Sequence, residues 1–349
     1  MAAKIQLRKG LEKKQYIGLK NMNIEGQTIL VTGGTGSFGQ KFTEIILKQI
    51  NPKSVRIYDN RELAGVEMER KFNDSRLRFF FGDVRDKNRL YRAMQGVDIV
   101  IHAAALKHVS VCEYNPIEAI RTNVEGAINI IDTAIDNSVK RVIAISTDKA
   151  VYPINLYGAT KMVAEKFFVQ GNSYTGSREI MFSCARYGNV IGSSGSVVPL
   201  FERQKKKGEI TITDKRMTRF WITLEEGVNF VINCIEQMKG GEIFVPKIPS
   251  MKIIDLARVI APEAKQNIIG IRPGEKLHEI LLTEEESRHT KELDNYFIIE
   301  PQYPFWGKDN YQNGKLVPEG FRYTSEINDK FITQEQMREI LRGLGISEN

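Results

Sequence analysis

Apolar residues in the first half of the chain gather in short runs that alternate with longer, amphipathic stretches. The runs have the length and composition of buried strands and lie at residues 28–31, 55–58, 77–81, 99–102 and 142–145. The stretches have helical spacing and lie at residues 62–72, 86–94 and 116–135, with another that ends at Gln49. This alternation predicts parallel βαβ units with right-handed crossovers, and so an α/β fold with a doubly wound parallel sheet of the Rossmann type.

The pattern changes after Asn189, where a Gly- and Ser-rich segment precedes a region that holds most of the prolines. We therefore predict a Rossmann-type domain over residues 26–190, to which residues near 219–247 return. Residues 191–349 are expected to form mainly a smaller, substrate-binding lobe and a C-terminal tail, and residues 1–25 an N-terminal extension. A length of 349 residues suits one large domain with an appended lobe.

The composition is that of an ordinary globular protein, with 42% hydrophobic residues and a formal net charge of +7. The positive charge reflects either a generally basic surface or attraction to an anionic substrate. No dense Lys/Arg tract with interleaved aromatic residues indicates nucleic-acid binding. The three cysteines and four histidines form neither a disulfide framework nor a zinc-ligand pattern. For the same reason we expect no metal site. No apolar run reaches the ~18 residues of a membrane helix, and residues 1–20 lack a signal-peptide core, so we expect a cytoplasmic protein.

A glycine-rich turn follows the first predicted strand and opens the first predicted helix. Its residues would bring backbone amides close to the pyrophosphate of a dinucleotide; they are Gly33, Thr35, Gly36, Ser37, Phe38 and Gly39. Asp59 lies 20 residues after Gly39, where a carboxylate accepts hydrogen bonds from a ribose 2′-hydroxyl and favours NAD. Arg61 could instead pair with the 2′-phosphate of NADP. Asp83 could hold the adenine amino group or cap the turn that follows its strand.

Four chemically active side chains lie shortly after the fifth predicted strand. Asp148 and Lys149 are adjacent, and Tyr157 and Lys161 lie one turn apart on one helix face. The Lys161 ammonium would lower the pKa of the Tyr157 phenol, so that the phenolate could accept a proton from a sugar or alcohol hydroxyl. Tyr152 is a rival tyrosine. Asp148 and Lys149 could also be a surface ion pair, which would contribute little.

Several motifs together resemble those of the extended short-chain dehydrogenase/reductase superfamily, in particular the inverting UDP-N-acetylglucosamine 4,6-dehydratases of its nucleotide-sugar branch. They lie at residues 32–39, 82–86, 102–108, 146–149, 157–161, 186–190, 217–220 and 272–276. The Asp148–Lys149 pair distinguishes this chain from the superfamily's epimerases, which usually carry small hydroxyl residues there. Retaining dehydratases usually carry Asp-Glu at the same place.

The resemblance implies a hydro-lyase reaction with tightly bound, recycled NAD(P). Tyr157 would take the proton of the 4-hydroxyl as hydride leaves carbon 4, and Lys149, as a neutral amine, would remove the proton from carbon 5. Asp148, held protonated, would donate to the departing 6-hydroxyl, and reprotonation on the opposite face would invert carbon 5. The product would be UDP-2-acetamido-2,6-dideoxy-β-L-arabino-hexos-4-ulose, for surface or flagellar sugars such as pseudaminic acid.

The resemblance also implies a set of ligand contacts and a homo-oligomer, either a dimer or a hexamer. The cofactor contacts are Gly33, Thr35, Gly36, Ser37, Phe38, Gly39, Asp59, Asn60, Arg61, Asp83, Val84, Ala103, Ala104, Ala105, Tyr157 and Lys161. The contacts with the UDP-sugar are Lys107, Asn189, Val197, Arg219, Arg272 and Glu275. Arg219 could instead form a structural salt bridge with Glu225 or Glu226. Family members often have Ser-Arg, which suits NADP, where this chain has Asp59–Asn60.

Three rival functions remain open at this point. A 4-epimerase would leave the mass of the UDP-sugar unchanged, and a retaining dehydratase would lose water but keep the configuration at carbon 5. A non-enzymatic dinucleotide-sensing protein could use the same fold.

Overall fold

The computed structural model describes residues 24–193, 195–303, 311 and 313–346. The expected N-terminal extension at residues 1–25 lies almost entirely outside this range. Within the described residues, no helix combines the length and the apolar character that crossing a membrane requires.

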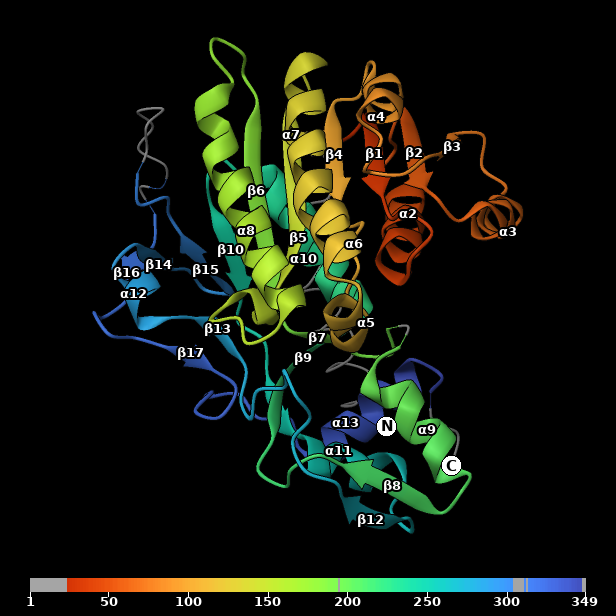
Figure 1. The fold of residues 1–349 in the computed structure, drawn as a ribbon, viewed down its shortest axis with the longest axis vertical. Coiled ribbons are helices and arrows are strands. Elements are labelled where there is room, and N and C mark those ends of the chain that lie inside the picture. The colour runs from red at the N-terminus through yellow and green to blue at the C-terminus, as the bar shows by residue number, and fades with distance from the viewer. Residues whose placement is uncertain (1–23, 194, 304–310, 312, 347–349) are drawn as a thin grey trace, which may run out of the picture.

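A ten-stranded sheet forms the centre of the larger part of the molecule (Figure 1). Its parallel part runs in the order β3 (Leu77–Phe81), β2 (Ser54–Asp59), β1 (Thr28–Thr32), β4 (Ile99–His102), β5 (Arg141–Thr147), β6 (Met181–Tyr187) and β10 (Ile243–Pro246). Three antiparallel strands extend it: β15 (Tyr296–Ile299), β14 (Thr290–Glu292) and β16 (Lys315–Leu316). The order 3-2-1-4-5-6 is that of the doubly wound Rossmann sheet, so the predicted fold class is confirmed.

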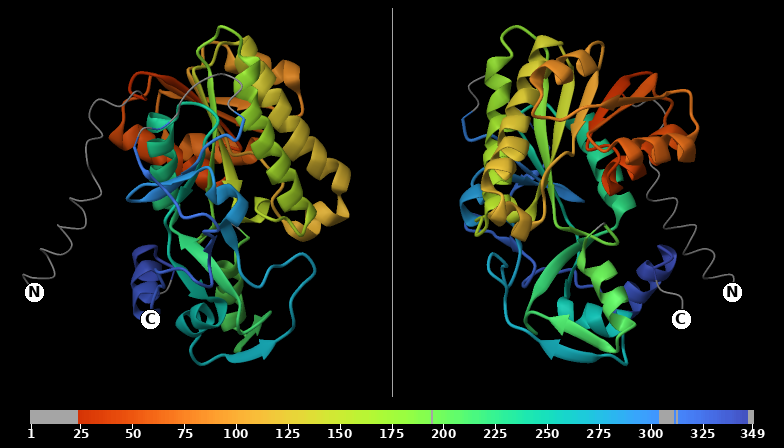
Figure 2. Two further views of the ribbon diagram at one scale, coloured as in Figure 1. Left: turned by 90° about the vertical axis from the view of Figure 1, so that its left-hand side faces the viewer. Right: turned by 45° about the vertical axis from the view of Figure 1, so that its right-hand side comes forward.

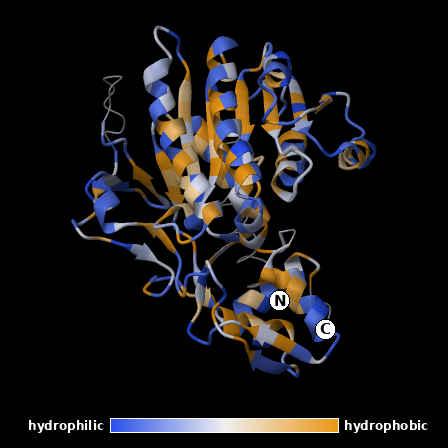
Figure 3. Cartoon of the chain, viewed as in Figure 1, coloured by the Kyte–Doolittle hydropathy of each residue, from blue (hydrophilic) through white to orange (hydrophobic). Residues whose placement is uncertain are grey.

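Helices cover both faces of this sheet (Figure 2). One layer contains α4 (Lys87–Met94), α7 (Gly126–Asp136) and α8 (Leu156–Gly171), and the other contains α2 (Ser37–Gln49) and α10 (Leu224–Gln237). α3 (Glu62–Phe72) packs at the β2–β3 edge. The strands between these layers are largely hydrophobic (Figure 3), and every residue of β1 and β4 is buried. Burial on both faces explains why these strands read as continuous apolar runs.

The helix predicted over residues 116–135 is interrupted. After α5 (Val109–Tyr114), the chain forms α6 (Pro116–Ile120), one turn of π-helix (η1, Arg121–Glu125) and then α7. The hydrophobic spacing of the segment does not reveal the extra residue in that turn. Such π-turns occur often at functional sites.

The smaller lobe (Figure 1) has its own hydrophobic core, which includes Phe201, Trp221 and Met337. Its helices are α9 (Val197–Lys205), α11 (Ile253–Ile260) and α13 (Gln334–Gly343), beside the pair β8 (Glu209–Ile212) and β12 (Lys265–Ile268). A sheet of β7 (Asn189–Val190), β9 (Thr218–Ile222) and β11 (Ser250–Lys252) joins it to the larger part. The remaining elements are β13 (Ile280–Leu282), β17 (Tyr323–Thr324), α12 (Glu284–Ser287), η2 (Asp148–Ala150) and η3 (Asn172–Tyr174). The residues after 190 therefore serve both parts, because α10, β10 and β14–β16 belong with the large sheet.

Candidate functional site

The reactive residues lie at the carboxyl end of β5, in the middle of the parallel sheet. β5 ends at Thr147, whose hydroxyl accepts a hydrogen bond from the backbone N–H of Lys149 and so starts η2. α8 then begins at Leu156, because the Asn155 side chain accepts from the N–H of Gly158 and caps the helix. Ligands of open α/β sheets bind at the carboxyl edge.

Asp148 and Lys149 form a buried pair. The Lys149 ammonium donates to Asp148 Oδ1 over 2.9 Å, and the Thr147 hydroxyl donates to the same oxygen, also at 2.9 Å. Asp148 is 0% exposed, and among the described residues its Oδ2 has no hydrogen-bond partner. The alternative of a surface ion pair is therefore wrong. A buried carboxylate oxygen without a partner would cost free energy unless a ligand satisfies it.

Glu279 joins this pair from a distant part of the sequence, and the sequence analysis missed it. Its Oε1 lies 3.7 Å from the Lys149 ammonium and 3.6 Å from Arg219 Nε, and its Oε2 lies 3.8 Å from the Lys276 ammonium. Burial alone would lower the pKa of Lys149, but the charges of Asp148 and Glu279 outweigh it and raise that pKa above its ordinary value. The resting site thus holds Lys149 as an ammonium, whereas the expected base is the neutral amine.

Tyr157 faces the same cluster from the start of α8. Burial raises the pKa of its phenol to about 12, and the positive charge of Lys149 is the main influence opposing that rise. The sequence analysis assigned this effect to Lys161, whereas in the structure it comes from Lys149. Lys161 is buried one turn further along α8, where burial lowers its pKa. Tyr152, the rival tyrosine, is 46% exposed and donates to Glu285.

The interrupted helix explains a second residue that the sequence analysis missed. Asn123 lies in the π-turn η1 and is buried. Its side chain accepts from the N–H of Leu106 at 2.8 Å, and donates to the carbonyl of Leu106 at 2.9 Å and to Thr160 Oγ1 at 3.0 Å. Asn123 therefore fixes the loop after β4 against the helix that carries Tyr157. No spacing in the sequence pairs these segments.

His102, at the end of β4, is a packing residue. Its Nδ1 lies 2.9 Å from the Thr32 hydroxyl, and its ring lies 5.6 Å from that of Phe168. Burial lowers its pKa to about 3, so the imidazole is neutral at physiological pH.

The glycine-rich turn has the shape that a pyrophosphate requires. Gly33 has φ of +64°, and a Cβ there would lie 2.9 Å from the backbone of Ala104. Gly39 packs against the backbone of Gly34, which draws α2 close to β1. Gly36 precedes α2 with no side chain to cap the helix, and an uncapped helix N-terminus after a glycine turn is a typical place for an anion to bind.

The acidic residue at the end of β2 is used differently from the expectation. Asp59 Oδ2 accepts from the N–H and hydroxyl of Thr35 and from Arg61 Nη2, while Oδ1 accepts from Arg61 N and Nε. Although burial opposes this, the bonds from Arg61 and Thr35 hold the pKa of Asp59 below its ordinary value. A Cβ on Gly36 would lie 3.7 Å from Arg61 Nη2, so the guanidinium sits beside the glycine turn.

Asp83 forms a similar pair at the end of β3. Its carboxylate accepts from the N–H, Nε and Nη2 of Arg85, and the Asn60 amide donates to it at 3.1 Å. The turn-capping alternative is therefore present in the structure. Val84 follows β3, and Ala103 and Ala105 follow β4, so the expected cofactor residues lie at the ends of the four neighbouring strands β3, β2, β1 and β4.

The expected substrate residues come from several elements. Arg219, in β9, donates to the carbonyls of Thr218, Lys276 and Leu277. Its acidic neighbour is Glu279, and Glu226 instead caps α10 with Thr223, so the alternative of a salt bridge with Glu225 or Glu226 is wrong. The sequence did not indicate Glu279 as the partner of Arg219, because the two residues lie 60 positions apart.

The other expected substrate residues are more open. Arg272 is exposed and lies 3.8 Å from Glu275, whose Oε2 is buried without a hydrogen-bond partner among the described residues. Asn189 Oδ1, in β7, is likewise buried without a hydrogen-bond partner among the described residues. Lys107 is exposed after β4, and Val197 begins α9.

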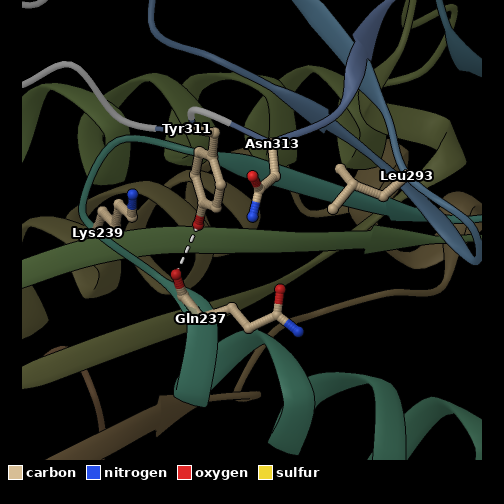
Figure 4. A pocket seen from close by; sticks show the side chains of 5 residues that line it. All are labelled: Gln237, Lys239, Leu293, Tyr311 and Asn313. Carbon is tan, nitrogen blue, oxygen red and sulfur yellow. Dashed lines mark hydrogen bonds between the residues drawn. The ribbon is translucent and has the colours of Figure 1, made fainter.

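A pocket of about 320 Å³ lies elsewhere, beyond the end of α10 (Figure 4). It is lined by Gln237, Lys239, Leu293, Tyr311 and Asn313, and the Tyr311 hydroxyl donates to the Gln237 carbonyl at 2.7 Å. Gln237 and Lys239 lie just before β10, so the pocket is at the amino end of that strand. It contains none of the expected site residues.

Comparisons with known proteins agree with the geometry. A family model described as "polysaccharide biosynthesis protein" matches residues 29–301. A UDP-N-acetylglucosamine 4,6-dehydratase (inverting) from Campylobacter jejuni is 51% identical over 90% of this chain and 97% of its own length. A UDP-glucose 4-epimerase from Rickettsia massiliae is 42% identical over 90% of this chain and 95% of its length.

Solved structures give the same result. The X-ray structure of Pen from Bacillus thuringiensis has a TM-score of 0.87 at 38% identity, covering 93% of this chain and all of that one. The dTDP-glucose 4,6-dehydratase DesIV from Streptomyces venezuelae, solved with NAD bound, shares the fold, with a TM-score of 0.65 at 24% identity over 72% of this chain and 86% of that one. This chain therefore belongs to the polysaccharide biosynthesis protein family, within the extended short-chain dehydrogenase/reductase superfamily, alongside the inverting UDP-N-acetylglucosamine 4,6-dehydratases.

Proposed function

We propose that this protein is an inverting UDP-N-acetylglucosamine 4,6-dehydratase, which converts its substrate into UDP-2-acetamido-2,6-dideoxy-β-L-arabino-hexos-4-ulose. The observation that carries the proposal is the buried Asp148–Lys149 pair beside Tyr157, at the carboxyl edge of the sheet. Elimination of water needs a base and an acid close together, and this pair supplies both. The identity to the Campylobacter jejuni enzyme supports the same reading.

Each reactive side chain has a role that its surroundings support. Tyr157 accepts the proton of the sugar 4-hydroxyl, and Lys161 supports it from the same helix face. Lys149 removes the proton from carbon 5, and Asp148 protonates the departing 6-hydroxyl, while its Oδ2, the oxygen without a hydrogen-bond partner among the described residues, is available to the substrate. Transfer of one proton from Lys149 to Asp148, across 2.9 Å, prepares the base and the acid together.

A nicotinamide cofactor fits the glycine turn. Gly33, Gly36 and Gly39 would hold its pyrophosphate, because a Cβ at Gly33 or Gly39 would meet backbone atoms. When bound, the cofactor accepts the hydride from carbon 4 and returns it to carbon 6, so it is not consumed. Tyr157 and Lys161, both on α8, belong to the part of the site that would face this cofactor.

For the dinucleotide itself we propose NADP. Asp59 would favour NAD if its carboxylate were available to a ribose hydroxyl. However, Thr35 and Arg61 engage both of its oxygens, and the Arg61 guanidinium lies next to the glycine turn. An arginine placed there can pair with a 2′-phosphate, as the family's usual Ser-Arg does.

The Arg61→Ala variant tests the cofactor choice. We expect it to weaken NADP⁺ binding by about tenfold or more and NAD⁺ binding much less, since one charge-assisted hydrogen bond contributes about 1.5–3 kcal/mol. Titration calorimetry of both dinucleotides measures this. Arg85→Ala, which removes the equivalent arginine of the Asp83 pair, is the matched control. Equal losses for both dinucleotides, or NAD in the purified protein by mass spectrometry, would contradict NADP.

The 4-epimerase is the second candidate, because a UDP-glucose 4-epimerase is 42% identical to this chain. Epimerisation needs hydride removal and return at carbon 4 and has no use for an acid–base pair at carbons 5 and 6. The buried Asp148–Lys149 pair therefore favours dehydration.

Incubation with UDP-N-acetylglucosamine in deuterated water, without added cofactor, separates these functions. We expect loss of one water by mass spectrometry, deuterium at carbon 5 and an L-arabino coupling pattern by proton NMR. D-xylo couplings would indicate a retaining dehydratase, and an epimerised product of unchanged mass an epimerase. No turnover would favour a non-enzymatic sensing role.

The cellular setting is also proposed. We place the enzyme in the cytoplasm, as a homo-oligomer of two or six chains, at the start of a pathway to bacterial surface or flagellar sugars of the pseudaminic acid type. The relatives' names concern nucleotide sugars, and the net charge of +7 suits an anionic UDP-sugar.

A further inference from the structure

Glu279 is a buried carboxylate at the centre of three cations, in a position that the proposed reaction does not explain. Its side chain is 3% exposed, and Lys149, Arg219 and Lys276 all lie within 3.8 Å of its oxygens. Among the described residues its Oε2 accepts no hydrogen bond. Burying a carboxylate is costly, so this one needs its cations or a function to offset that cost.

The backbone fixes Glu279 firmly. Its N–H donates to the Ser325 hydroxyl at 2.9 Å, and its carbonyl accepts from the Ser325 N–H at 2.8 Å. The Ser325 hydroxyl also lies 2.7 Å from that of Thr218, next to Arg219. These contacts hold the backbone of Glu279 in place, with its carboxylate 3.7 Å from the Lys149 ammonium.

We infer that Glu279 is a positioning residue for Lys149: with Asp148 it holds the lysine between two carboxylates, and it thereby sets the pH at which the carbon 5 proton is removed. The inference rests on the proposed dehydratase function. Glu279 does not touch the reacting atoms. It acts through the lysine, by favouring the ammonium over the neutral amine.

The proton transfers of the proposed reaction explain why a second carboxylate beside Lys149 is useful. The ammonium of Lys149 first gives its proton to Asp148, leaving a neutral amine and a carboxylic acid. The amine then takes the carbon 5 proton while the acid gives its proton to the 6-hydroxyl, which leaves as water. Both groups have then returned to their resting charges, ammonium and carboxylate, and Glu279 stabilises that resting pair.

Several elements of the fold bring charged groups close to Lys149. Asp148 on η2 and Glu279 before β13 favour its ammonium form, while Arg219 on β9 and Lys276 before β13 disfavour it. Tyr157 on α8 is also coupled to it. Glu279 and Lys276 are the members of this group without an expected place on the substrate or on the reacting atoms, and of the two Glu279 favours the ammonium form of Lys149.

The test is the pH dependence of deuterium uptake at carbon 5 of UDP-N-acetylglucosamine, by wild-type protein and the Glu279→Gln variant. Removing the carboxylate should lower the pKa of Lys149, so that the Asp148–Lys149 pair loses its single proton to solvent, and with it the acid for the 6-hydroxyl, at lower pH. The alkaline limb of the profile should therefore move to lower pH by about one unit or more. Glu279→Asp, which keeps the charge but shortens the side chain, should give a smaller shift in the same direction.

Glu286→Gln is the matched control. Glu286 is another partly buried carboxylate in an ion pair, with Arg186, and it makes no contact with Lys149. Its loss should affect stability without moving the alkaline limb. If Glu279→Gln and Glu279→Asp both fold, by circular dichroism, and keep the wild-type limb, the inference is overturned, even where their maximal rates fall.

A second measurement separates this inference from the proposed function. Nitrogen-15 NMR of lysine side chains follows the titration of Lys149, assigned by the Lys149→Arg variant, without any substrate. A lower pKa in Glu279→Gln supports the coupling even if wild-type protein does not dehydrate UDP-N-acetylglucosamine, an outcome that would refute the function alone. An unchanged pKa overturns the coupling, whatever the enzyme's activity.

Discussion

Replacing Lys149 by alanine should reduce deuterium uptake at carbon 5 of UDP-N-acetylglucosamine by about 100- to 10,000-fold, the contribution of a well-placed general base. Binding of the UDP-sugar and cofactor should change little, because Lys149 faces Asp148 and Glu279 and not the glycine turn. Proton NMR in deuterated water measures the uptake, and calorimetry measures the binding.

Lys149→Arg makes this test specific to proton transfer. Arginine keeps the positive charge that Asp148 and Glu279 require but does not release its proton at accessible pH. Both variants should therefore lose uptake, while Lys149→Arg should retain more stability, since it leaves no buried carboxylate without a cation. Uptake at the wild-type rate in either variant would remove Lys149 from its assigned role.

Replacing Tyr157 by phenylalanine should block the first step, the oxidation at carbon 4, with a loss of about 100- to 10,000-fold in its rate. The phenol is the group next to Lys149 that can take the 4-hydroxyl proton, and phenylalanine keeps its packing but not its oxygen. Stopped-flow absorbance of the reduced nicotinamide, after mixing with substrate, follows this step.

Tyr152→Phe is the matched control for this second prediction. Tyr152 is 46% exposed and bonds to Glu285, so its phenol is not part of the buried cluster. Its variant should reduce the bound cofactor at close to the wild-type rate. A full absorbance signal from Tyr157→Phe, or its loss from Tyr152→Phe, would exchange the roles of the two tyrosines.

The parts of the fold and site that depend on neighbouring residues could be predicted from the sequence. The strands and most of the helices up to residue 147 follow from periodicity, α5 and the π-turn η1 excepted, and the glycine turn follows from its place between strand and helix. Asp148, Lys149 and Tyr157 belong to one short segment, so their proximity follows from local geometry. These features need no knowledge of the rest of the chain.

The features that the sequence did not reveal depend on contacts between distant segments. Glu279 lies next to Lys149 only after the chain has passed through the smaller lobe, and Asn123 acts through one π-turn. The short antiparallel strands β14 and β16 carry too few residues for a clear period. Asp59 stands where the pattern predicts it, but the orientation of its carboxylate toward Thr35 is set by packing.

Lys276 donates to the backbone carbonyls of Asp148 and Val151, which precede it by 128 and 125 residues. Asn155 similarly donates to the carbonyl of Gly274, over 119 residues. During synthesis, the segment with Asp148 and Lys149 leaves the ribosome well before the segment that fastens it, because chains emerge from their N-terminus. Until residues 274–279 dock, Lys149 lacks its second carboxylate and the start of α8 lacks its brace. The site thus becomes complete only after residues 274–279 have been synthesised and have docked.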